Sequence, residues 1–200
     1  MRNDPDPSGL KVLPLTPEHH QRFLDYHATA HDDAPQGSGG GWCYCVAWWV
    51  PHWVGFGERT AEQNRELRER LLSIGVADGW LGVLDDKTVG WCQGGPRDQL
   101  GRIAFHYKRP ADPDCWAIGC LQVPHPLRRQ GIARDLLRGV LAHMRQAGAR
   151  RVEAYPTVDK SGGAADPAEL WPGPLVLYRS LGFRVIGRKG PVRIMGLELK

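Results

Sequence analysis

Residues 115–146 read CWAIGCLQVPHPLRRQGIARDLLRGVLAHMRQ, and this stretch decides the fold. The run 115–123 is mostly apolar and has the length of a strand, which predicts a central strand buried on both faces. Residues 131–146 then carry an apolar side chain at every fourth position from Ile132 onward, which predicts an amphipathic helix. Another short strand is expected at 151–155. Strand, helix and strand therefore follow one another in the order of a right-handed parallel crossover.

The rest of the chain alternates between strand and helix patterns. Thr60 and Gln63 form a capping box that predicts a helix start, and Thr16 before Pro17 predicts another. The aromatic run 42–50 is strongly strand-prone. Strands are predicted at 10–15, 42–50, 80–84, 88–93, 183–187 and 192–199, and helices at 16–29, 60–75 and 175–181. Together these elements predict an α/β (α+β) fold with a mixed sheet and helices on its faces.

Composition narrows the class of protein. The chain has 200 residues, a formal net charge of +4 and 42% hydrophobic residues, which suits one globular domain over 1–200. No stretch approaches the roughly 20 consecutive apolar residues of a membrane-spanning helix. Lys and Arg are scattered rather than clustered, which disfavours a nucleic-acid binder. Five cysteines, an odd number, favour a reduced, cytoplasmic setting. A flexible connector is expected at about 33–41 and a long loop at 156–174.

The turn 127–133 carries the strongest chemical signal. It lies between the predicted central strand and the predicted helix, where backbone N–H groups are unpaired and the helix dipole is positive, so it can cradle a phosphate. Gly131 allows a pyrophosphate to approach the backbone, and Arg128 and Arg129 add positive charge. A basic turn that only caps a helix is the alternative interpretation.

Two motifs together suggest a family. Arg-x-x-Gly-x-Ala at 128–133, followed by Leu-Tyr-Arg-Ser-Leu-Gly-Phe at 177–183, resembles the GNAT superfamily of N-acetyltransferases. The resemblance implies a mostly antiparallel sheet of about seven strands with a central parallel pair and helices on both faces. It also implies that the turn holds the pyrophosphate of acetyl-coenzyme A, while the pantetheine arm pairs with the edge of the preceding strand. The residues implied in coenzyme binding are Leu121, Gln122, Val123, Arg128, Arg129, Gln130, Gly131, Ile132, Ala133 and Arg134.

The resemblance implies that a primary amine attacks the thioester directly. Tyr178 matches the position of the family's general acid, and a ring that packs beside Phe183 is the alternative. A main-chain N–H near Val123 is expected to stabilise the oxyanion. The central strand has no carboxylate, so Glu153 and His125 are the candidate bases, each with a surface role or a salt bridge as the alternative.

Some features depart from the family pattern. Tyr155 and Pro156 stand where many family members have an asparagine that contacts the coenzyme. The long loop is expected to be either a wall of the acceptor site or a tolerated surface insertion. If it is a wall, the residues facing the substrate would be Asp159, Lys160, Asp166, Glu169 and Trp171. The tryptophans at 42, 48, 49 and 53 suit an acceptor pocket, an ordinary core or a dimer face.

Partners follow from the same reasoning. The acceptor is expected to be a small-molecule or peptide amine, with no nucleic acid or membrane as a partner and a homodimer as a plausible assembly. Cys43 and Cys45 do not repeat the spacing of a zinc knuckle, so no metal is expected. The alternatives are a catalytically silent GNAT-fold module that binds the coenzyme, and an adaptor protein that uses its basic surface.

Overall fold

A computed structural model describes residues 9–29, 42–50, 55–76, 78–158 and 171–199. Seven strands form one sheet in the order β1-β2-β3-β4-β5-β7-β6. Their bounds are β1 (Lys11–Pro14), β2 (Gly79–Leu84), β3 (Lys87–Pro96), β4 (Cys115–Gln122), β5 (Arg151–Ala154), β6 (Arg184–Lys189) and β7 (Val192–Glu198). β4 and β5 pair in parallel, whereas the other neighbours in the sheet pair antiparallel. The expected mixed, seven-stranded sheet with a central parallel pair is confirmed.

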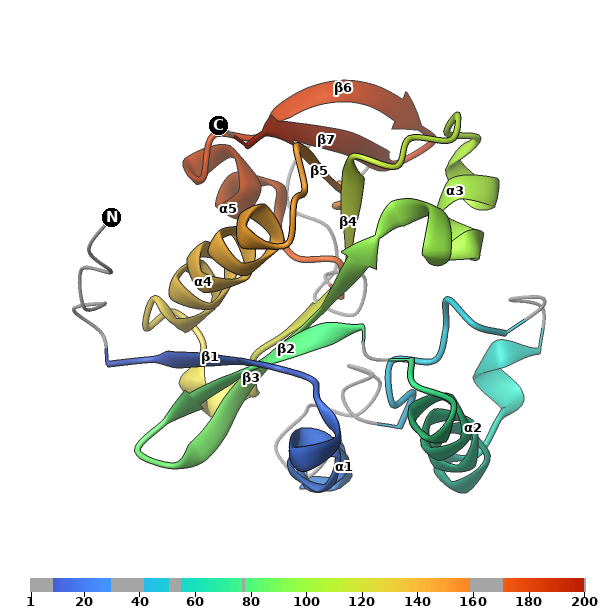
Figure 1. Cartoon of the computed structure of the whole chain (residues 1–200), viewed down its shortest axis with the longest axis vertical. Coiled ribbons are helices and arrows are strands. Elements are labelled where there is room, and N and C mark those ends of the chain that lie inside the picture. Colours follow the sequence, from blue (N-terminus) through green and yellow to red (C-terminus); the bar gives the residue numbers. More distant parts are fainter. Residues whose placement is uncertain (1–8, 30–41, 51–54, 77, 159–170, 200) are drawn as a thin grey trace.

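Helices cover both faces of this sheet, as expected (Figure 1). They are α1 (His20–Thr29), α2 (Ala61–Ser73), α3 (Gly101–Tyr107), α4 (Ile132–Gln146) and α5 (Leu175–Ser180). The apolar row of α4 is buried in one cluster with Cys92 and Leu121 of the sheet. The neighbouring sheet residues Trp91 and Cys120 instead pack with α1 and α2, because successive side chains of a strand point to opposite faces. No described helix is both long and apolar enough to span a membrane.

β4 and β5 separate partway along their length. Their pairing runs from Cys115 opposite Arg151 to Ile118 opposite Ala154, where β5 ends. β4 continues for four more residues, and on its other side it stays paired with β3 as far as Gln122. From Gly119 onward, no strand among the described residues pairs with the edge of β4 that faces β5.

The predicted strand at 42–50 is wrong. These residues form consecutive turns, and Tyr44 and Cys45 have positive φ angles of 42° and 52°. The buried guanidinium of Arg68 donates to the carbonyls of both residues, at 3.0 and 2.7 Å. Because a side chain of α2 donates to these carbonyls, they are hydrogen-bonded without pairing to a neighbouring strand.

Other elements follow the expected pattern with small changes. The capping box of Thr60 and Gln63 is present at the start of α2. The helix α3 was not predicted; it lies in the connection between β3 and β4 and ends before Lys108, whose φ is +50°. The connector at about 33–41, Trp53, and the part of the long loop with Asp159, Lys160, Asp166 and Glu169 lie outside the described residues.

Candidate active site

The turn before α4 forms the first part of the site. Gly131 is the N-cap residue at φ +88°, and Arg129 also adopts a positive φ of 66°. The carbonyl of Gly131 accepts from the N–H groups of Arg134 and Asp135 at 2.9 and 3.2 Å. Ile132, as the first helical residue, has no carbonyl one turn back to bond, so the end of the helix presents backbone donors to the turn. The turn therefore combines positive charge with backbone donors at a helix start, an arrangement that favours the binding of an anion.

The side chains of this turn are mostly exposed. Arg129, Gln130 and Arg134 are exposed, and Ala133 is half-buried with only a methyl group to fill space at the helix end. Arg128 bends back toward the sheet, because its Nε donates to the carbonyl of Val123 at 3.0 Å. The structure therefore gathers the residues of the motif into one basic turn and ties the turn to the end of β4.

The edge of β4 forms the second part of the site. The N–H of Leu121 donates to the carbonyl of Trp171 at 2.8 Å. Two residues earlier, the carbonyl of Gly119 accepts from the indole Nε1 of Trp48 at 3.3 Å. The carbonyl of Gln122 instead accepts from the hydroxyl of Tyr26 at 3.3 Å. Alternate residues of a strand direct their backbone groups to opposite sides, so Leu121 rather than Gln122 faces the side that β5 leaves open.

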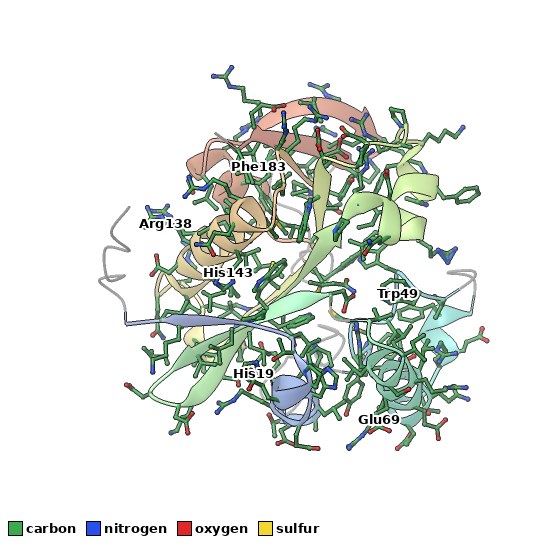
Figure 2. All side chains as sticks on the ribbon, viewed as in Figure 1. His19, Trp49, Glu69, Arg138, His143 and Phe183 are labelled. Carbon is green, nitrogen blue, oxygen red and sulfur yellow. The ribbon has the colours of Figure 1, made fainter. Side chains whose placement is uncertain are left out.

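Tyr178 lies directly behind this edge. Its side chain is fully buried, and its hydroxyl donates to the carbonyl of Pro172 at 2.6 Å. Its ring also meets the ring of Phe183 edge-on, with centroids 5.3 Å apart, as the packing interpretation expected. Figure 2 labels Phe183 beside α4 and α5. Burial is the main cause that raises the pKa of the Tyr178 phenol well above its ordinary value. The phenol therefore stays protonated at neutral pH and remains able to donate.

Glu153 lies in a buried ion-pair network. Its carboxylate is 3.1 Å from Arg97 and 2.7 Å from Arg109, and it accepts from the Tyr155 hydroxyl at 2.7 Å. The side chain of Glu153 is 5% exposed, so this salt bridge is in the core rather than at the surface. Donors from these three side chains surround the carboxylate, and the network joins β5 to the residues that flank α3.

The second candidate base is placed differently. His125 is exposed at the start of the 3-10 helix His125–Leu127, between the end of β4 and the basic turn. Of the two candidates, His125 is the one beside the turn that precedes α4.

Sequence reasoning missed the backbone contacts of two tryptophans. Trp48 and Trp171 meet at the open edge of β4, where their ring centroids are 5.4 Å apart. Trp48 is buried, whereas Trp171 is 39% exposed. A clustering of tryptophans was visible in the sequence, but the β4 backbone atoms that they contact could not be read from it.

The cysteines give no sign of a metal site. All five are free, and among the described residues no three His, Cys, Asp or Glu side chains gather to hold an ion. Burial raises the pKa of the Cys92 thiol far above its usual range. That thiol is therefore uncharged and behaves as a small apolar side chain.

A shallow cavity of about 480 Å³ lies away from this site. It is formed by α3 and the β6–β7 turn and is lined by Phe105, His106, Lys108, Arg109 and Lys189. None of these residues belongs to β4 or to the turn before α4. The cavity is therefore separate from the candidate site, which is defined by backbone donors.

Comparisons with known proteins agree with this geometry. The model of the Acetyltransferase (GNAT) family matches residues 42–167. The fold is similar to that of the PaiA N-acetyltransferase of Thermoplasma acidophilum in complex with coenzyme A (14% identity, 95% of this chain and 99% of that chain, TM-score 0.52). It is also similar to the ribosomal-protein-S18-alanine N-acetyltransferase of Escherichia coli (11% identity, 96% and 94%, TM-score 0.53). A third similar structure is the NatC complex bound to Gag peptide and CoA (14% identity, 96% and 99%, TM-score 0.51).

No curated protein matches the chain by sequence. At these identities the structural likenesses establish the fold alone. The family model covers more than half of the 200 residues, including β4, the basic turn and α4, although it ends before Tyr178. The chain therefore belongs to the GNAT family of acetyltransferases.

Proposed function

We propose that the protein is an N-acetyltransferase that moves an acetyl group from acetyl-coenzyme A to a primary amine. The observation that carries the proposal is the placement of a basic turn at the start of α4 directly after a β4 edge that β5 leaves unpaired from Gly119 onward. One part suits a pyrophosphate, and the other suits the amides of a pantetheine arm. In a chain of this family, the two parts together would form the two halves of a coenzyme site.

Particular groups would hold the coenzyme. The backbone N–H groups at the start of α4, with the side chains of Arg129 and Arg134, would bind the pyrophosphate. Gly131 carries no side chain to block that approach. Gln130 and Arg128 would border the same turn, and the backbone of Leu121 and Val123 would pair with the pantetheine arm. When bound, acetyl-coenzyme A supplies an activated acetyl group as a thioester.

The chain's own groups would then assist the transfer. The acceptor amine nitrogen forms a bond to the carbonyl carbon as the carbon–sulfur bond breaks, and the amine loses one proton. A backbone N–H of the β4 edge, from Leu121 or Val123, would donate to the carbonyl oxygen as negative charge develops there. The Tyr178 hydroxyl would give its proton to the departing sulfur. His125 or solvent would take the proton from the amine.

Two similar structures suggest which kind of amine acceptor to test first. The similar structures include an alanine N-acetyltransferase of a ribosomal protein and a complex bound to a peptide. They support a peptide amine as the acceptor to test first, with small-molecule amines beside it. The aromatic ring of Trp48, which donates to the Gly119 carbonyl at the β4 edge, would border the acceptor.

One observation favours a second candidate function. The N–H of Leu121, which would serve the coenzyme, is already bonded to the Trp171 carbonyl. A module that binds coenzyme weakly and does not turn it over would also show this contact. Release of free thiol from acetyl-coenzyme A in the presence of amines separates an enzyme from such a module.

Calorimetric titration with coenzyme A tests the donor half of the proposal, with ATP as the control nucleotide. Arg129→Gln is expected to weaken coenzyme binding about tenfold, because a charge-assisted contact to phosphate is lost. Arg138→Gln is the matched control, since Arg138 is 62% exposed on the outer side of α4, away from the turn (Figure 2). Equal affinity of the two variants would contradict the assignment of the turn. Lack of coenzyme binding both by the unaltered protein and by variants that free the Leu121 N–H would contradict the proposed function itself.

A further inference from the structure

We propose that residues 171–173 form an internal strap that occupies the coenzyme edge of β4 and must be displaced before the coenzyme can bind. This inference rests on the proposed function, because it concerns access to the same edge. The strap consists of Trp171, Pro172 and Gly173, which lie just before Pro174, the N-cap residue of α5.

Three contacts hold the strap in place. The Trp171 carbonyl accepts from the Leu121 N–H at 2.8 Å, and the Pro172 carbonyl accepts from the Tyr178 hydroxyl at 2.6 Å. The Trp171 ring packs against the ring of Trp48, with centroids 5.4 Å apart. Pro172 and Gly173 are buried. The strap therefore covers the free edge of β4 with the chain's own backbone.

The strap cannot continue as an added strand of the sheet. Gly173 has a φ of +84°, far outside the β region, and a Cβ there would lie 3.1 Å from Leu121 Cδ2 and 3.1 Å from Tyr178 Oη. Prolines stand on both sides of this glycine, and neither has an N–H to donate. The strap thus makes a local contact with β4 instead of a ladder, and a local contact can be exchanged for another ligand.

Displacement would free two groups at once. The Leu121 N–H points in one direction, so it cannot donate to the Trp171 carbonyl and to a bound pantetheine or acetyl group at the same time. The Tyr178 hydroxyl likewise has one proton, which it now gives to Pro172. Opening the strap therefore exposes the binding edge and releases the proposed acid together. Only molecules with an open strap can bind coenzyme, so the apparent affinity for coenzyme falls as the closed fraction rises.

Two variants loosen the strap by different means. Gly173→Ala places a methyl group at a strained φ and against Leu121 and Tyr178, whereas Trp171→Ala removes the ring contact with Trp48 but keeps the backbone carbonyl. Gly148→Ala is the matched control: its φ is +95°, and nothing lies within 4 Å of its added Cβ. None of these substitutions alters the turn before α4.

Coenzyme A affinity, measured by calorimetry, is the first readout. Both strap variants are expected to bind coenzyme A at least about threefold more tightly than the unaltered protein, because the closed fraction falls, while Gly148→Ala binds as the unaltered protein does. Amide hydrogen exchange at Leu121, measured without coenzyme, is the second readout. Exchange at Leu121 is expected to be faster in both strap variants and unchanged in Gly148→Ala. Trp171→Ala keeps the test available if Gly173→Ala does not fold.

The outcomes separate the two proposals. Unchanged or weaker coenzyme binding in both strap variants, with binding by the unaltered protein, overturns the strap and leaves the proposed function standing. Unchanged exchange at Leu121 in both variants also overturns the strap. Binding by the variants alone supports a strap that is closed in nearly all molecules. If no protein binds coenzyme A at millimolar concentration, the proposed function fails and the strap has no ligand to exclude.

Discussion

Replacement of Arg68 by methionine is expected to destabilise the protein strongly. The Arg68 side chain is fully buried, and its guanidinium lies 2.6 Å from the Asp78 carboxylate. It also donates to the carbonyls of Tyr44 and Cys45 at 3.0 and 2.7 Å. The substitution leaves a buried carboxylate and two buried carbonyls without these donors.

The magnitude follows from these contacts. Removal of one partner of a buried ion pair costs about 3–5 kcal/mol of unfolding free energy. Asp78 keeps two other donors, Gln93 at 2.6 Å and the Trp49 indole at 3.2 Å, so the lower end of that range applies. Figure 2 labels Trp49 close to α2. For a chain of this length, about 3 kcal/mol corresponds to a fall in Tm of about 6–12 °C.

Thermal unfolding followed by circular dichroism measures this change. Arg65→Met is the matched control on the same helix, because Arg65 forms an exposed pair with Glu69 and its loss is expected to shift Tm by about 2 °C or less. The double variant Arg68→Met with Asp78→Asn removes both charges and is expected to recover part of the loss. If Arg68→Met shifts Tm no more than Arg65→Met does, the ion pair does not hold 42–50 in its turns.

Other substitutions test the site and the packing. Tyr178→Phe is expected to retain coenzyme binding and to slow thiol release, and an unchanged rate across the pH range would remove the acid assignment. Burial raises the pKa of Tyr178 in the folded state. The phenol therefore contributes stability below the unfolded pKa, and this contribution is lost as pH rises above about 10. The fall in Tm from pH 9 to 11 should consequently be smaller in Tyr178→Phe than in the unaltered protein. Gly131→Val is expected to abolish coenzyme binding, whereas Gly148→Val, at a similar positive φ, should leave it intact; calorimetry decides. Gly139→Ala should lower stability by about 1–3 kcal/mol in urea unfolding, since its Cβ would lie 2.4 Å from Val12, and an unchanged midpoint would argue against close packing of α4 on β1.

Local patterns predicted most of the fold. The apolar row of α4, the capping box of α2 and the strand-length apolar run of β4 each depend on residues within a few positions of one another, so the sequence was enough to place them. The family resemblance extended this to a seven-stranded sheet with a central parallel pair, whereas the order of the strands came from the structure. The turn before α4 is local as well, because a Gly at positive φ and the first N–H groups of a helix are neighbours in the chain.

The segment 42–50 shows where local patterns fail. Its aromatic and β-branched residues favour a strand, but the distant Arg68 binds two of its carbonyls and the segment turns instead. Glu153 is similar: nothing beside it in the sequence indicates that Arg97 and Arg109 enclose it. In both cases a side chain remote in sequence decides the conformation or the surroundings.

The sequence by itself determined the crossover from β4 to β5 through α4 and the basic turn at its start, because hydrophobic period and helix ends are encoded by adjacent residues. Only the tertiary structure decided which groups meet at the open edge of β4. There the Leu121 N–H bonds to Trp171, fifty positions along the chain, and the Tyr178 hydroxyl bonds to Pro172. The physical reason is that nearly every residue has the same backbone donor and acceptor, so the sequence does not show which of these groups will pair. The geometry of the folded chain decides their partners.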